Sequence, residues 1–250
     1  MKTSFAALAA MVSVAACATP YTPIPYDREI AGLDHVSVMD SKLPEKATTQ
    51  KLATNGQNMA SAMAASAGLA GVLVGAVAAG IEAGIEAGQR DRMLAVLDSV
   101  DFDGQAIFDA ALNESLAEGG YEIDSVHFDR KSTAVLIETP VADETKAGYG
   151  FLDVAGAGYG YQLVGGNTEW RPFVSVSVRM TDRVNPGNVL LENKVVYNPV
   201  ATPDVIVNIA PDGEYSFAKI EDMESDPERT AKGLEVALVE TARAIAQLAQ

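Results

Sequence analysis

The chain has 250 residues, 48% of them hydrophobic, and a formal net charge of -16 at pH 7, with a pI of about 4.4. This length fits one domain with appendages or two small domains, and the apolar content is enough for a core. So much negative charge repels phosphate backbones and anionic headgroups. It therefore argues against a nucleic acid partner and against electrostatic adhesion to a membrane.

The N-terminus has the pattern of a secretory signal peptide. Lys2 precedes an apolar run over residues 5–14, and the sequence VAAC (residues 14–17) ends at Cys17, the only cysteine. VAAC resembles the lipobox of bacterial lipoproteins. The resemblance implies that residues 1–16 are removed and that Cys17 is acylated, which anchors the protein in a membrane. Ala18 after the cysteine, instead of Asp, implies the outer membrane and its periplasmic face.

The elements that follow predict one α+β domain. Residues 17–32 contain three prolines and predict an extended linker, after which residues 33–250 form the domain. The alternation over 33–40 predicts a strand, the polar stretch 42–51 a turn, and the Gly/Ala-rich stretch at about 52–100 a long helix. Further expected elements are a helix before Gly119, strands near 121–128, 133–139, 149–166, 171–182, 188–198 and 204–209, and a helix from Asp226 onward. This order predicts an antiparallel sheet covered by helices on one face.

The motifs that carry chemistry in other proteins are incomplete in this chain. The two histidines, His35 and His127, fall on predicted strands without a cysteine or a spaced carboxylate cluster beside them. The DFDG stretch (residues 101–104) has Leu112 where a calcium loop needs its closing Glu, so we interpret Asp103 as a helix N-cap. The GAGYG run (residues 156–160) lies inside a strand, where glycines indicate close approach by another backbone. We therefore expect no catalytic, cofactor or metal site.

The stretch GLAGVLVGAVAAGIEAGIEAG (residues 68–88) places small residues along the predicted helix at spacings of three and four. They form two rows, whose glycines are Gly68, Gly71 and Gly75 in one and Gly80, Gly84 and Gly88 in the other. The pattern resembles the glycine-zipper segments of small envelope lipoproteins, in which smooth helix faces pack closely. Three interpretations remain open: packing within the domain or on a partner helix, insertion into a membrane as an oligomer, and a flexible tether.

The stretches AEGGYEIDSV, GYGFLDVAGAGYGYQ, WRPFVSVSVRMTD and NVLLENKVVYN follow one another after the helices. In order and character, residues 30–250 resemble the auxiliary lipoproteins of envelope transport and assembly systems. The resemblance implies a non-enzymatic accessory subunit of an envelope transport or assembly complex. From the glycine rows, we expect a protein partner or a second copy to bind through the glycine-rich helix. The alternatives are a self-associating lipoprotein whose helices form a bundle or pore, and an enzyme acting on envelope components.

Overall fold

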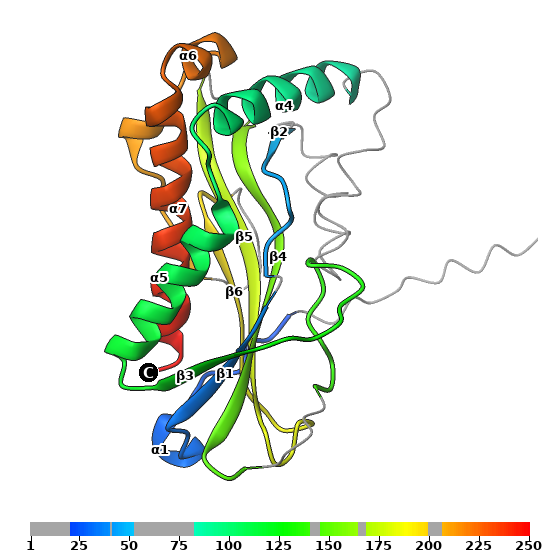
Figure 1. Ribbon diagram of the computed structural model, residues 1–250, viewed down its shortest axis with the longest axis vertical. Helices are drawn as coiled ribbons and strands as arrows, with labels where there is room; N and C mark the ends of the chain where they lie inside the picture. Colours follow the sequence, from blue (N-terminus) through cyan, green and yellow to red (C-terminus); the bar gives the residue numbers. More distant parts are fainter. Residues whose placement is uncertain (1–20, 41, 53–82, 141–145, 165–168, 200–206) are drawn as a thin grey trace, which may run out of the picture.

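A mixed sheet of seven strands carries the fold in the computed structural model, which describes residues 21–40, 42–52, 83–140, 146–164, 169–199 and 207–250 (Figure 1). The strands are β1 (His35–Met39), β2 (Thr48–Leu52), β3 (Glu122–Val126), β4 (Tyr149–Val164), β5 (Trp170–Asp182), β6 (Val189–Tyr197) and β7 (Val207–Ile209). Their order across the sheet is β3-β1-β4-β5-β6-β7, and β2 also pairs with β4. The α+β class is confirmed.

Helices cover one face of this sheet. They are α1 (Arg28–Ala31), α4 (Ala83–Asp98), α5 (Gly104–Glu118), α6 (Ile220–Ser225) and α7 (Pro227–Leu248), with a short 3-10 helix at Gly213–Tyr215. Figure 1 shows α5 and α7 lying together on the same side of the long strands. Two predicted N-caps are confirmed, because Asp103 accepts a hydrogen bond from the Ala106 amide at 2.9 Å and Asp226 accepts one from the Arg229 amide at 3.2 Å.

Apolar and polar residues alternate strictly along β5, and its apolar side chains lie against the helices, as predicted. Val174, Val176, Val178 and Met180 are fully buried, and they share one core cluster with Leu234 and Leu238 of α7. Burial of a large aliphatic side chain contributes about 1.5–3 kcal/mol, so this layer contributes strongly to stability.

The pairing directions differ from the predicted antiparallel sheet. The strands β4, β5 and β6 pair antiparallel, whereas β1 runs parallel to β3 and β4, β2 runs parallel to β4, and β7 runs parallel to β6. Parallel neighbours require long crossover connections, and α5 lies in the crossover between β1 and β3. Alternation in a sequence defines the faces of a strand but not the direction of its neighbour. The antiparallel prediction is therefore confirmed for the central strands β4, β5 and β6 and wrong for the pairs that β1, β2 and β7 form.

Two segments adopt other structures than predicted. Residues 133–139 form turns and bends, and residues 48–52, expected to lead into a helix, form β2. In addition, part of the predicted linker packs on the domain, because Ile24 forms a β-bridge with Glu192 and the guanidinium of Arg28 lies 4.1 Å from the ring centroid of Tyr121. These segments contact residues that are distant in the sequence, so the local sequence pattern does not predict their structure.

The glycines of β4 accept a neighbouring backbone, as the sequence indicated. A Cβ atom at Gly156 would lie 2.7 Å from the carbonyl oxygen of Lys42, and one at Gly160 would lie 1.8 Å from that of Thr48. The φ angle of Gly160, +148°, is also one that residues with a side chain rarely adopt. The close approach brings residues 42–48 onto β4 and allows β2 to pair there.

The predicted Gly/Ala-rich helix and the lipobox fall mainly outside the described residues. Cys17, Gly68, Gly71, Gly75 and Gly80 all lie there, while Gly84 and Gly88 belong to α4, the described end of the predicted 52–100 helix. Gly88 is exposed, with no described neighbour within 4 Å of a Cβ atom built on it. Helix packing through these glycines stays a prediction. Among the described helices, none has the length and apolar character that a membrane span needs.

The close approach of Gly160 to the Thr48 carbonyl can be tested by its effect on stability. Gly160→Ala places a methyl group on the Thr48 carbonyl and strains the backbone, so we expect the free energy of unfolding to fall by about 3 kcal/mol or more. Gly213→Ala is the matched control, because its Cβ meets no described atom within 4 Å, and it should change stability by less than about 0.5 kcal/mol. Urea unfolding followed by circular dichroism measures both, and equal stability of the two variants would contradict the close approach.

Candidate functional site

The face of the sheet opposite α7 is crossed by residues 127–140. Successive β4 side chains alternate between the faces: Leu152 and Val154 belong to the helix-side core, and Phe151 and Asp153 point the other way. The ring of Phe128 packs edge-on against Phe151 with centroids 5.5 Å apart. We call residues 127–140 the covering segment, because it covers side chains of β4 that would otherwise face solvent.

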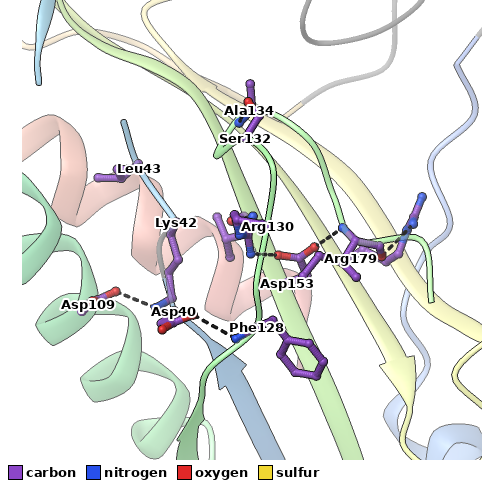
Figure 2. Close-up of polar contacts among 12 residues, drawn as sticks. Asp40, Lys42, Leu43, Asp109, Phe128, Arg130, Ser132, Ala134, Asp153 and Arg179 are labelled. Carbon is purple, nitrogen blue, oxygen red and sulfur yellow. Dashed lines mark hydrogen bonds and ion pairs between the residues drawn. The ribbon is translucent and has the colours of Figure 1, made fainter. Parts of the chain in front are cut away.

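A buried ion pair fixes the covering segment to the sheet (Figure 2). The Arg130 guanidinium lies 2.5 Å from Asp153, and the two side chains are only 5% and 3% exposed. The second carboxylate oxygen of Asp153 accepts a hydrogen bond of 2.6 Å from the Ile137 amide. Taking two charges out of water costs several kcal/mol each, and the cost is offset only when further hydrogen bonds satisfy them. Here one carboxylate holds the covering segment at two positions, Arg130 and Ile137.

A second ion pair extends this network across the sheet. Arg179 stands opposite Asp153 in the β4–β5 register and pairs at 2.7 Å with Glu192, its register partner on β6. Arg179 also donates a long hydrogen bond of 3.4 Å to the carbonyl oxygen of Ile137. The backbone of Glu192 in turn exchanges hydrogen bonds of 2.8 and 3.0 Å with Ile24. The network therefore joins β4, β5 and β6 to two segments that lie outside the sheet.

A third ion pair joins the end of β1 to α5. The ammonium of Lys42, itself buried, lies 2.7 Å from Asp109 (Figure 2). Gln105 supports the contact, because its side-chain amide donates to Asp109 at 2.9 Å and its carbonyl oxygen accepts from the Leu43 amide at 2.9 Å. These bonds position residues 42–43 where they meet Gly156 of β4. Like the Arg130–Asp153 pair, the Lys42–Asp109 pair fixes a segment of the backbone, here residues 42–43.

Each histidine lies beside carboxylates, at opposite ends of the β1–β3 pair. His35 stacks on Tyr149 with centroids 4.0 Å apart and lies 3.4 Å from both Glu122 and Asp124. His127, beyond the end of β3, contacts Asp40 at 2.5 Å. The two rings therefore do not meet. In the described part of the chain, no three His, Cys, Asp or Glu side chains are placed to hold a metal ion.

The contact between His127 and Asp40 shifts the pKa of both groups. The hydrogen bond and the charge of Asp40 raise the pKa of His127 above its ordinary value. Partial burial alone would raise the pKa of Asp40, but the hydrogen bonds from His127 and from the Phe128 amide outweigh it and lower the pKa. The contact joins the end of β1 to the start of the covering segment, and it is strongest where Asp40 is ionised and His127 protonated.

Sequence reasoning missed the residues of this network. Arg130, Asp153, Arg179 and Lys42 were not candidate site residues. The one available signal was Asp153, a charge within the otherwise apolar run GFLDVAGAG (residues 150–158). A buried charge requires a partner of opposite sign, but that partner lies 23 residues away in a segment with no regular structure.

Removing the positive charge of the Arg130–Asp153 pair tests how much this pair contributes to stability. Arg130→Met leaves Asp153 buried without its counter-charge, so we expect the free energy of unfolding to fall by about 3–5 kcal/mol. Trypsin should also cleave faster after the exposed Lys131 in the covering segment.

The matched control is Arg243→Met, which removes an ion pair with Glu240 whose side chains are 57% and 44% exposed. We expect that change to cost less than about 0.5 kcal/mol. Denaturant unfolding and timed proteolysis measure both variants. The network would not hold the covering segment if Arg130→Met behaved like the control.

Known proteins do not supply a family for this chain. Comparison with protein-family models, curated proteins and solved structures finds no match. The evidence for its role is therefore its own sequence and its own contacts.

Proposed function

We propose that this protein is a non-enzymatic lipoprotein of the outer membrane, facing the periplasm, that serves as an accessory subunit of an envelope transport or assembly complex. One observation carries the proposal: the only cysteine, Cys17, directly follows small residues at the end of an apolar run. In the auxiliary lipoproteins that the sequence resembles, the lipid holds an α+β domain beside its partners. The domain described above is of that class.

The contacts of Asp153 favour a structural role for its charge over a catalytic one. A general acid or base needs a carboxylate or imidazole that is within reach of a substrate and free to exchange protons. Asp153, the most buried carboxylate of the network, instead has both oxygens bound to fixed donors, Arg130 and the Ile137 amide. Such an arrangement stabilises a shaped surface, which is what an accessory subunit presents to its partner.

The glycine rows supply the second part of the proposal. We propose that a Gly/Ala-rich helix over about residues 52–100, which includes α4, packs through its smooth faces on a partner helix or on a second copy. The glycines of these faces are Gly68, Gly71, Gly75, Gly80, Gly84 and Gly88. Lipid attachment would already anchor the chain, because acyl chains contribute about 0.8 kcal/mol per buried methylene. The helix is then available for protein contact.

Replacing the anchor tests the proposal. In the producing bacterium, the wild-type chain should fractionate with the outer membrane, and mass spectrometry of its N-terminal peptide should show acylated Cys17. A chain in which an ordinary cleaved signal peptide replaces residues 1–17 should be soluble in the periplasm, because it has no lipid. The control is Thr19→Ser, which leaves the VAAC motif intact and should behave as wild type.

Two outcomes would contradict the proposal. An unmodified Cys17 in the mature wild-type chain would exclude lipid anchoring. Membrane retention of the lipid-free chain would assign the anchor to another part of the protein, and deletion of residues 60–88 would show whether the glycine-rich stretch supplies it. If retention and self-association both disappear with that deletion, the bundle or pore alternative is favoured.

A further inference from the structure

A groove lies beside the start of α5, away from the charge network. It has a volume of about 710 Å³ and is formed by the turn Ser99–Asp103 after α4, the first turns of α5 and one side of α7. The α7 residues in it are Glu228, Ala231, Lys232 and Glu235. Their spacing of three and four places them on one face of the helix. Figure 1 shows the α4–α5 connection running beside α7.

The floor of the groove is apolar. Phe102, Ile107 and Ala231 are only partly buried, and each packs against the hydrophobic core on one side while lining the groove with the other. Covering these side chains would remove further apolar surface from water, at about 25 cal/mol per Å². The groove therefore offers three partly exposed apolar side chains between α5 and α7, and amphipathic helices bind in grooves of this kind.

The rim of the groove is acidic. It carries the four carboxylates of Asp101, Asp103, Glu228 and Glu235 and one ammonium, that of Lys232. Lys232 is paired with Glu235 at 2.6 Å, and Asp103 caps α5. Asp101 and Glu228 have no ion pair within the part of the chain that the structure describes. A concave site lined by one sign of charge attracts ligands of the other sign.

The chain itself offers no segment with the complementary charge. The residues outside the description are 1–20, 41, 53–82, 141–145, 165–168 and 200–206, and Lys2 is the only Lys or Arg among them. A second copy of the chain, with a net charge of -16, would also be repelled by the acidic rim. Charge complementarity thus favours a different, cationic partner.

We propose that this groove binds a cationic amphipathic helix of a partner protein. Apolar side chains on one face of that helix would contact Phe102, Ile107 and Ala231, and its Lys or Arg side chains would reach the carboxylates of the rim. This inference rests on the proposed accessory role, since it names the chemistry of the protein that the subunit binds.

Fluorescence anisotropy with designed peptides tests the inference on the full chain, held in zwitterionic nanodiscs with empty nanodiscs as background. The probe is a labelled peptide of about 18 residues with Leu on one helical face and Lys on the other. Asp101→Asn combined with Glu228→Gln should weaken its binding about three- to tenfold, because two charge contacts are lost. Asn suits the backbone of Asp101, whose φ is +51°.

The control variant combines Glu114→Gln with Glu118→Gln, two exposed carboxylates further along α5 that do not line the groove. It removes the same charge and should bind the probe as wild type does. A peptide with Glu in place of Lys, and one of the same composition without an apolar face, should bind weakly to every variant.

Equal binding by the two double variants would overturn the proposal, and so would equal binding of the peptide without an apolar face. Self-association of the wild-type chain that the groove variant alone loses would also overturn it, because the occupant would then be a second copy. None of these results alters Cys17 acylation or membrane fractionation. Failure of the groove proposal is therefore distinguishable from failure of the lipid anchor.

Discussion

The charge of Asp153 lies in the first half of β4, a strand that is buried on both faces from Gly150 to Gln162. Leaving this carboxylate without its counter-charge would cost about 3–5 kcal/mol, a large part of the roughly 5–15 kcal/mol by which a domain is stable. Arg130 and the Ile137 amide compensate it, and both belong to the covering segment. The covering segment is therefore needed to compensate the charge of Asp153. Its path is ordered because it brings two hydrogen-bond donors, Arg130 and the Ile137 amide, to one carboxylate.

A close backbone approach acts together with this charge. Because β4 has glycines at Gly156 and Gly160, residues 42–48 lie directly against it, and β2 pairs with its second half. The Lys42–Asp109 pair then connects the same residues to α5. The helices, the covering segment and the strands β1 and β2, which pair parallel with β4, are therefore all arranged around this one strand.

The sequence predicts the parts of the fold that depend on local pattern. The alternation of β5, the capping residues Asp103 and Asp226 and the apolar face of α7 follow from periodicity and from the chemistry of helix ends. The parallel pairing of β1, the irregular path of residues 133–139 and the partner of Asp153 depend on residues distant in the chain. The acidic groove was missed for the same reason, since α5 and α7 come from opposite halves of the sequence.

Buried charged side chains of this protein hold the covering segment on the sheet. Native-state hydrogen exchange of the Ile137 amide tests the claim most directly, because this amide has a carboxylate as its acceptor instead of a strand partner. We expect the Ile137 amide to be protected from exchange together with the amides of β4 and to open with them. Rapid exchange at Ile137 while β4 stays protected would contradict it.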